Sequence, residues 1–413
     1  MEKITGNVVV GQSGGPTAVI NASVAGVYRG AKELGAEKVY GMVHGIQGFL
    51  ERNLIDLDEY LAADAGIELL KRTPSAFLGT CRYKLPEIAG NEAVYQQIFD
   101  VLEEYHIEAF FYIGGNDSMD TIKMLSDYAA AHGKKQRFVG IPKTVDNDLP
   151  ITDHCPGYGS AAKYIAASLK EVIRDVQSTG LTKPTVLLVE IMGRHAGWLA
   201  AAAALAKGAD CDGADAIYLP ERVFDIDDFV AHIEDVAKEK NTVVIAVSEG
   251  IKIADGRFVC ELSGGADSVD VFGHKQLSGC ALTLADIVGS RTGFKTRAIE
   301  LSTLQRAAAH LSSATDIEEA MEAGYHGVAA AAEGKTGVMV VLRRLQDKPY
   351  AFTLDTYDIH SIANQERTVP LSWITEDGRG LTEEFIQYAR PLIMGELTPL
   401  YVDGLPAHLV RKK

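Results

Sequence analysis

The densest group of reactive side chains is the stretch from Lys143 to Asp148, which holds a lysine, a threonine and two aspartates between two prolines. Proline cannot continue a helix and fits poorly in a central strand, so the stretch is predicted to be a rigid loop. It follows the short apolar run 137–141, and open α/β sheets bind ligands at the carboxyl ends of their strands. One aspartate could be a general base and the other a metal-associated carboxylate, with Lys143 and Thr144 holding an anionic substrate. Taken alone, such a stretch is more often a solvated acidic turn.

Two glycine-rich turns point to phosphate binding. Residues 7–17 and 109–118 each run from an apolar strand through glycines into a predicted helix. Bare glycines and the positive end of the following helix let backbone N–H groups approach a phosphate closely. Two turns of this plan suggest opposite walls of a phosphate site, although Asp117 and Ser118 could simply cap a helix.

The first turn also contains Gly-x-Ser-x-Gly around Ser13, the pattern of a hydrolase nucleophile. A pattern this short often occurs by chance, so a serine hydrolase is only a remote alternative. No Gly-Lys-Ser or Gly-Lys-Thr follows, which excludes a P-loop.

Other charged residues follow further predicted strands. Arg194 comes directly after a glycine at the end of a buried strand, which suits charge stabilisation at a phosphoryl group. Glu221 could bind a sugar hydroxyl or cap the next helix, and Arg82 alone would more often be a surface charge. Arg297 and Arg306 are predicted to lie on nearby turns of one helix.

The remaining elements are predicted to follow the same order of strand, turn and helix, as in a parallel α/β protein. Further strands are predicted at residues 38–43, 185–191, 216–219, 242–247 and 337–342. Helices are predicted to begin at Pro16 and near Ser160, another over residues 382–392, and a glycine loop over residues 45–48.

Composition sets the outer limits. A chain of 413 residues and 44.5 kDa exceeds the size at which one core keeps growing, so two domains are expected. Its net charge of −16 repels nucleic acid and acidic lipid heads, so an anionic ligand needs a local cluster of cations. Five widely spaced cysteines indicate neither disulfides nor a zinc site and fit a reducing cytosol. The alanine-rich run 196–206 falls far short of the ~20 residues that a bilayer needs, so no membrane insertion is expected.

Several motifs occur in the order found in phosphofructokinases. They are Gly14–Thr17 with Asn21, Gly114–Ser118, Pro142–Asp148, Met192–Arg194, Pro220–Glu221, Ser248–Gly250 and Gln305–Arg306. Through these motifs the chain resembles that family, in particular its pyrophosphate-dependent branch. The resemblance implies an α/β fold of two Rossmann-like three-layer αβα domains with largely parallel sheets and a cleft between them. It implies a phosphate-donor domain of residues 1–156 plus about 306–365, and a sugar-phosphate domain of residues 157–305 plus about 366–413.

The resemblance also implies a role for each matching position. Asp146 would remove the proton from the C1 hydroxyl of fructose 6-phosphate, and Asp117 and Asp148 would hold Mg²⁺. Thr144 and Arg194 would contact and stabilise the transferring phosphoryl group. The sugar would be held by Met192, Gly193, Glu221 and Arg306, and its 6-phosphate by Arg297. The donor side would be lined by Gly15, Arg82, Gly114, Asp117, Ser118 and Lys143.

The identity of the donor is predicted from Asp117 and Lys143. Family members that use ATP usually have glycine at both positions, which leaves room for the nucleotide. In this chain a carboxylate and a long cation fill that room. Two unit charges ~4 Å apart attract each other by about 4 kcal/mol at an effective dielectric constant near 20, so Lys143 could neutralise a pyrophosphate oxygen. The pocket is therefore predicted to accept inorganic pyrophosphate and to exclude a purine.

Three positions depart from the family pattern, and one of them is Thr303, which replaces the usual aromatic residue or histidine before Leu-Gln-Arg. Asn116 stands where the family usually has aspartate, which leaves Asp117 and Asp148 as the metal anchors. Thr185 stands where many ATP-using relatives carry an arginine that reaches a neighbouring subunit's sugar phosphate, with Lys183 as a substitute nearby.

The expected activity is reversible transfer of a phosphoryl group from pyrophosphate to fructose 6-phosphate by a cytoplasmic homodimer or homotetramer. An ATP-dependent phosphofructokinase is the alternative within the same class. A serine hydrolase built on Ser13 and a non-catalytic sugar-phosphate sensor are alternatives from other classes.

Overall fold

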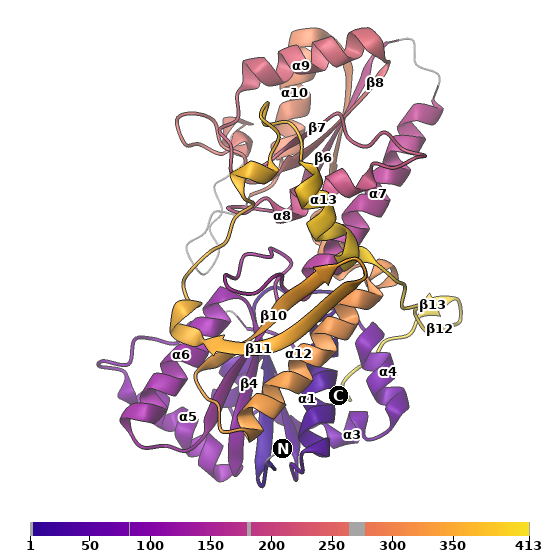
Figure 1. Cartoon of the computed structure of the whole chain (residues 1–413). Helices are drawn as coiled ribbons and strands as arrows, with labels where there is room; N and C mark the ends of the chain where they lie inside the picture. Colours follow the sequence, from indigo (N-terminus) through magenta and orange to yellow (C-terminus); the bar gives the residue numbers. More distant parts are fainter. Residues whose placement is uncertain (1–2, 82, 180–182, 264–276, 413) are drawn as a thin grey trace.

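A computed structural model of the chain describes residues 3–81, 83–179, 183–263 and 277–412. Within these residues there are two lobes, each built on one large β-sheet with helices on both faces (Figure 1). The sheet of the first lobe has the strand order β11-β10-β5-β4-β1-β2-β3, and that of the second has the order β7-β8-β6-β9. The predicted architecture of three-layer αβα units with largely parallel sheets is confirmed.

The first sheet is parallel except at its edges. Its strands are β1 (Asn7–Gln12), β2 (Val39–Met42), β3 (Leu54–Asp56), β4 (Ile107–Gly114), β5 (Arg137–Pro142), β10 (Val338–Asp347) and β11 (Tyr350–Asp358). Strands β3 and β11 pair antiparallel with their neighbours. In β1, Val8 and Val10 pack on one face and Val9 on the other, because successive side chains of a strand alternate. Both faces are apolar, as expected for a parallel sheet covered on both sides.

Helices α1 (Ile20–Glu33), α3 (Asp58–Leu61), α4 (Asp64–Arg72) and α12 (Ala314–Ala332) cover one face, and α2 (Gly45–Leu50), α5 (Glu92–Glu104) and α6 (Asn116–Ala131) cover the other. The closest pair is α1 with α12. A Cβ atom at Gly26 would lie 1.9 Å from the carbonyl oxygen of Met321, and one at Gly324 would lie 2.2 Å from that of Ser23. Glycine therefore allows the two backbones to touch.

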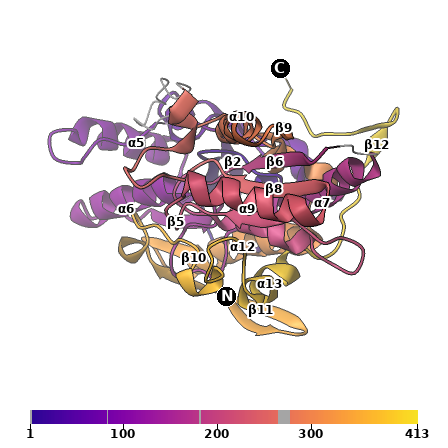
Figure 2. The same cartoon turned by 90° about the horizontal axis from the view of Figure 1, so that it is seen from above.

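The second sheet is wholly parallel and smaller (Figure 2). Its strands are β6 (Thr185–Ile191), β7 (Ala216–Tyr218), β8 (Thr242–Ser248) and β9 (Lys295–Glu300). One face is covered by α7 (Tyr158–Ser178), α8 (Trp198–Ala201) and α13 (Glu383–Ala389), and the other by α9 (Ile226–Glu239) and α10 (Cys280–Thr292).

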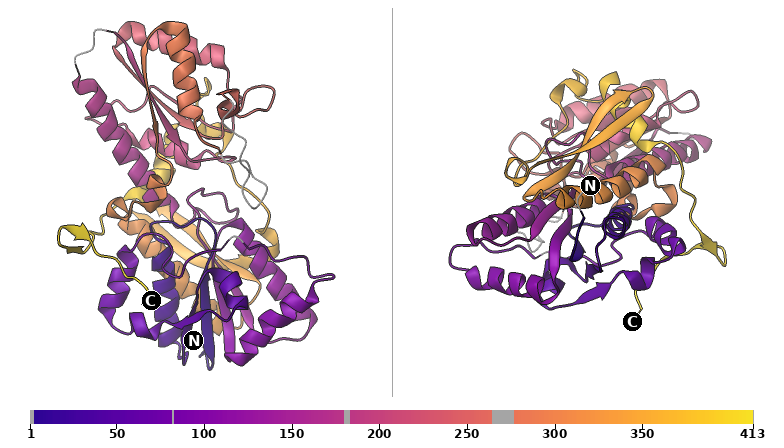
Figure 3. Two further views of the ribbon diagram at one scale, coloured as in Figure 1. Left: turned by 180° about the vertical axis from the view of Figure 1, so that it is seen from behind. Right: turned by 60° about the horizontal axis from the view of Figure 1, so that its bottom comes forward.

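The chain passes between the lobes more than once. It enters the second lobe through α7, returns to the first in α12, and rises again after β11 (Figures 1 and 3). The C-terminal hairpin of β12 (Tyr401–Val402) and β13 (Leu405–Pro406) projects from the body, and the tail then returns to the first lobe, where the N–H of Leu409 donates to Thr73 Oγ1 at 2.8 Å. None of the described helices has the length and apolar character needed to cross a bilayer.

Several predicted elements were wrong or missed. The helix predicted between Arg297 and Arg306 is instead β9 followed by the short helix α11 (Leu304–Ala307), because pairing with β6 outweighs local propensity. The glycine loop at 45–48 is the start of α2. The first helix begins at Ile20, not at Pro16, because a turn closed by the N–H of Val19 and Thr17 Oγ1 (3.3 Å) comes first. Helix α12 and strand β11 were not predicted.

Candidate active site

The site is built at the carboxyl ends of three adjacent strands, β1, β4 and β5. Gly114 lies opposite Pro142 in the register of β4 and β5, and the N–H of Lys143 donates to the Gly114 carbonyl at 3.0 Å. On the other side of β4, the N–H of Ser13 donates to the Ile113 carbonyl at 2.9 Å. Both predicted glycine turns and the aspartate loop therefore meet at one edge of the sheet.

Lys143 is the best buried cation at this edge, with 3% of its surface exposed. Its Nζ donates to the carbonyl oxygen of Gly15 at 2.6 Å, so it crosses from the β5 loop to the first glycine turn. Burial lowers the pKa of Lys143 to about 8; Asp146 and Asp148 oppose this shift, and Arg306 adds to it. An anion bound beside the ammonium would replace the interactions with water that burial has removed.

The glycine turns leave space that side chains would close. A Cβ atom at Gly15 would lie 2.9 Å from Arg306 Nη1, and one at Gly114 would lie 1.9 Å from Ser118 Oγ. The structure thus brings the predicted sugar-binding Arg306 against the donor-side Gly15, and packs Ser118 under Gly114. Asp117, one residue before Ser118, is exposed in the first turn of α6.

The Asp146 carboxyl is placed by its own loop. The N–H of Asp146 donates to Thr144 Oγ1 at 3.1 Å, and that hydroxyl lies 3.5 Å from Asp146 Oδ2. The residue keeps access to solvent, but the protein around its carboxyl removes enough hydration to raise its pKa, against the opposing effect of Lys143. A raised pKa makes a carboxylate a stronger base.

Asp148 supplies a second carboxylate beside the first. Burial, followed by repulsion from Asp146, raises the pKa of Asp148 to about 7, and within the described part of the chain its buried Oδ1 has no hydrogen-bond partner. Among the described residues no three His, Cys, Asp or Glu side chains are grouped to hold a metal ion. The unsatisfied carboxylate oxygen of Asp148 is the type of ligand that suits Mg²⁺, which is usually bound through one or two carboxylates together with substrate phosphates and water.

The sugar-side motif lies beyond the end of β6. Gly193 has φ +146°, and a Cβ atom there would lie 2.8 Å from the Ala196 carbonyl oxygen, so glycine is required. The N–H of Met192 donates to Gln305 Oε1 and that of Gly193 to Glu249 Oε1, both at 3.3 Å. Burial raises the pKa of Glu249 to about 7.

Glu221 lies at the end of the next strand in the chain, β7. Its Oε1 accepts the N–H groups of Gly197 at 2.8 Å and Val369 at 2.9 Å, while its buried Oε2 has no hydrogen-bond partner among the described residues. Burial raises the pKa of Glu221. One oxygen is thus fixed by the backbone, and the other is shielded from solvent.

Three arginines were also predicted to belong to the site, and the structure does not bring them together. Arg194 is half-buried and its charge opposes the raised pKa of Glu249. Arg297 lies on the exposed edge strand β9 in register with Leu187, five residues before Met192, which is roughly 16 Å along the strand. Arg297 is therefore not brought next to the Met192–Arg194 motif. Arg82 lies outside the described residues.

The comparison with known proteins decides the family. The phosphofructokinase family profile matches residues 7–331. The chain belongs to the phosphofructokinase family. It is 43% identical over 405 residues, 98% of this chain and 95% of the other, to a Methylococcus capsulatus protein named pyrophosphate–fructose 6-phosphate 1-phosphotransferase. A Xanthomonas campestris protein of the same name is 42% identical over 408 residues, 98% of this chain and 96% of the other.

A solved structure agrees. The crystal structure of a pyrophosphate-dependent phosphofructokinase from Nitrosospira multiformis superposes with a TM-score of 0.88 at 39% identity and covers 98% of each chain. The predicted membership of this family and its fold are confirmed.

Sequence reasoning missed the segment that packs on the loop of Asp146 and Asp148 in this phosphofructokinase. Residues 364–369, between the lobes, were assigned no chemistry. Asn116 Nδ2 donates to the Gln365 carbonyl at 2.8 Å, and Asn116 Oδ1 accepts the N–H of Asn364 at 2.5 Å. The asparagine thus anchors this segment to the start of α6. Glu366 belongs to the same segment, and its negative charge raises the pKa values of Asp146 and Asp148.

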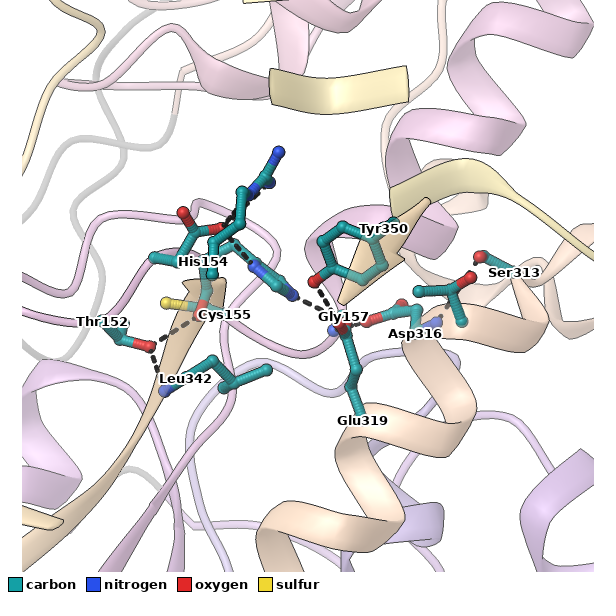
Figure 4. Close-up of polar contacts among 12 residues, drawn as sticks. Thr152, His154, Cys155, Gly157, Ser313, Asp316, Glu319, Leu342 and Tyr350 are labelled. Carbon is teal, nitrogen blue, oxygen red and sulfur yellow. Dashed lines mark hydrogen bonds and ion pairs between the residues drawn. The ribbon is translucent and has the colours of Figure 1, made fainter. Parts of the chain in front are cut away.

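A buried polar network lies behind the loop (Figure 4). The His154 ring, 1% exposed, lies between Glu319 Oε2 at 2.6 Å and Asp153 Oδ2 at 2.8 Å. Arg344 also contacts that Asp153 oxygen at 3.0 Å, and the Tyr350 hydroxyl bonds to Glu319. Burial alone would lower the pKa of His154, but the two carboxylates outweigh it and raise the pKa to about 9. A histidinium therefore connects the loop to α12.

Proposed function

We propose that the protein transfers a phosphoryl group from pyrophosphate to the C1 hydroxyl of fructose 6-phosphate, giving fructose 1,6-bisphosphate and phosphate, and that the reaction is reversible. The observation that carries the choice of donor is Lys143, whose buried ammonium lies on the Gly15 carbonyl at the strand ends. The names of the relatives in Methylococcus and Xanthomonas support the same donor.

In the proposed reaction Asp146 accepts the proton of the C1 hydroxyl as its oxygen attacks phosphorus. A new bond forms between that oxygen and phosphorus, the bridging P–O bond of pyrophosphate breaks, and phosphate leaves. Thr144 orients Asp146 through the hydrogen bonds described above. Arg194 stabilises charge on the transferring group, and positioning together with charge stabilisation provides most of the rate enhancement.

The substrates are proposed to lie on opposite sides of Asp146. Gly15, Gly114, Ser118 and Lys143 line the pyrophosphate side, and Met192, Gly193, Glu221 and Arg306 the sugar side, whereas Arg297 would reach the sugar phosphate of a second copy. Residues 1–156 with about 306–365 form the donor domain in this proposal, and residues 157–305 with about 366–413 the sugar domain. Asp117 and Asp148 hold Mg²⁺, which screens the phosphate charges when bound.

The exposed position of Arg297 supports a homodimer or homotetramer in which this side chain reaches a second copy. The free state of all five cysteines supports a cytoplasmic enzyme.

The deciding experiment is turnover by the purified protein with Mg²⁺, fructose 6-phosphate and either pyrophosphate or ATP, with fructose 1,6-bisphosphate measured by a coupled assay. We expect turnover with pyrophosphate and little with ATP. Turnover with ATP alone would replace the donor assignment. A folded protein that binds fructose 6-phosphate and turns over neither donor would be a sensor.

The surroundings of Ser13 argue against a serine hydrolase. Ser13 is 8% exposed and its hydroxyl interacts with the Tyr112 phenol, and among the described residues no imidazole hydrogen-bonds to it. A serine-directed phosphonate is therefore expected to leave Ser13 unlabelled.

A further inference from the structure

One arginine outside the predicted motifs binds the catalytic loop from behind. Arg367 Nη1 donates to the carbonyl oxygens of Thr152 at 2.9 Å and Asp153 at 2.7 Å, and Nη2 donates to that of Asn147 at 3.0 Å. The backbone N–H of Arg367 donates to the Asp148 carbonyl at 2.7 Å. Four carbonyls of one loop are therefore bound by one residue, at both ends of the turn 147–153, which begins directly after Asp146 and includes Asp148.

Arg367 also contacts the second lobe, which carries the proposed sugar site. Its guanidinium carbon lies 4.7 Å from the centre of the Trp198 ring, and Trp198 Nε1 donates to the Arg367 carbonyl at 3.0 Å. Two residues later, the N–H of Val369 holds Glu221 Oε1. A single extended segment thus joins the proposed base to a proposed sugar ligand from the other lobe.

We propose that Arg367 is a positioning residue for phosphoryl transfer: it fixes the Asp146 loop at a set distance from Glu221, and so sets where the base meets the sugar hydroxyl. This inference rests on the proposed function. The planar guanidinium presents donors in a rigid fork, so it reaches carbonyls on both sides of a turn. A lysine keeps the charge but is a flexible point donor. A misplacement of the base by about 1 Å can lower the rate by roughly 100-fold.

The test compares Arg367→Lys with Arg390→Lys. Arg390 is a matched control, because its Nη1 also donates to a carbonyl, that of Leu205 at 3.1 Å, which belongs to the second lobe and not to the catalytic loop. We expect Arg367→Lys to lower kcat by about 100-fold while the KM for pyrophosphate changes by less than about threefold, since Lys143 and Gly15 are untouched. Arg390→Lys should leave kcat within about twofold.

Hydrogen exchange gives a second readout that needs no substrate. In Arg367→Lys the amides of residues 145–156 should exchange at least tenfold faster, whereas those of β6 and β8 should not change. Faster loop exchange with unchanged kcat would overturn the proposal, and so would a loss of kcat without faster loop exchange. An equal loss of kcat in Arg390→Lys would also overturn it.

Two further outcomes are separated in advance. If the wild-type protein does not turn over pyrophosphate, the proposed function fails, and loop exchange still tells whether Arg367 holds the loop. If Arg367→Lys does not fold, Trp198→Phe decides, because it removes the indole N–H bond to the Arg367 carbonyl and retains most of the packing. We expect that variant to lose about tenfold in kcat, and a value within about twofold of wild type would overturn the proposal.

Discussion

At the scale of single residues, the buried Lys143 both carries a positive charge and fills space in the proposed donor site. Its ammonium bonds to a backbone carbonyl, and no carboxylate of the described residues forms a direct ion pair with it. The cost of burying it is visible in its lowered pKa. A phosphate oxygen arriving beside it would recover part of that cost, which favours a compact dianionic group over an uncharged ring.

Asp146→Asn tests the proposed base. Asparagine has nearly the same shape but cannot accept the hydroxyl proton, so kcat should fall by roughly 10²–10⁴. The melting temperature should stay close to that of wild type, because the loop contacts of Thr144 remain. A coupled assay showing nearly wild-type rates would refute the role of this residue.

The double substitution of Asp117→Gly with Lys143→Gly tests donor selection. It removes a carboxylate and a cation from the region where a nucleotide would have to fit. The ratio of kcat/KM for ATP to that for pyrophosphate should therefore rise, by roughly tenfold or more if only about 1.4 kcal/mol of exclusion is relieved. An unchanged ratio, with the protein still folded, would show that these two residues do not choose the donor.

Contiguous motifs were the part of the site that could be predicted. Lys143, Thr144, Asp146 and Asp148 lie in one short loop, so their proximity follows from the chain itself. Arg367 could not be found in this way, because the nearest of the loop carbonyls that its guanidinium binds, that of Asp153, lies 214 positions away. No local pattern marks a residue whose partners are backbone carbonyls, since every residue has one.

At the scale of elements, α1 and α12 show how far packing decides the fold. Gly26 and Gly324 allow backbone contact between helices that are nearly three hundred residues apart in the chain. Glycine lowers intrinsic helix propensity, so its presence in both helices is explained by the approach and not by local preference.

Gly26→Ala should lower the free energy of unfolding by at least about 3 kcal/mol, because the new methyl group would clash with the Met321 carbonyl. Gly289→Ala in α10 is the matched control: its Cβ would have an ordinary contact of 3.5 Å with Thr296 Oγ1. That control should be neutral or stabilise by up to about 1 kcal/mol. Denaturant unfolding of both variants measures the difference, and equal effects would contradict the packing argument.

Strong apolar runs predicted the buried strands well. Residues 109–113 and 185–191 are strands because both of their faces are covered, and a continuous apolar run is the signal of such a strand. Strand β9 gave no such signal, since its residues are half-buried or exposed. It is a strand because β6 offers it a partner, and this information is not contained in residues 295–300.

At the scale of the whole molecule, the His154 network couples stability to pH. The pKa of His154 is about 9 in the folded protein, against about 6.5 in an unfolded chain. The proton is therefore bound more tightly in the folded state. The resulting stabilisation is complete below about pH 6.5 and is lost as the pH rises through about 9.

We expect the free energy of unfolding of wild type to exceed that of His154→Gln by an amount that decreases between pH 6.5 and pH 9. The decrease should be about 3 kcal/mol at most, from a shift of about 2.5 pKa units. Taking the difference between the two proteins removes the contribution of other titrating groups, such as Asp148 and Glu249. A difference that does not vary with pH would mean that His154 is neutral in the folded protein.

The strand order of the first sheet also has a consequence for biosynthesis. Strand β5 ends at Pro142, but the strand that covers its open edge, β10, begins only at Val338. At ~5–20 residues per second, a ribosome needs roughly 10–40 s to produce the missing partner. During that interval the nascent chain presents an unpaired apolar edge, so protection by chaperones on the ribosome would matter most for this part of the polypeptide.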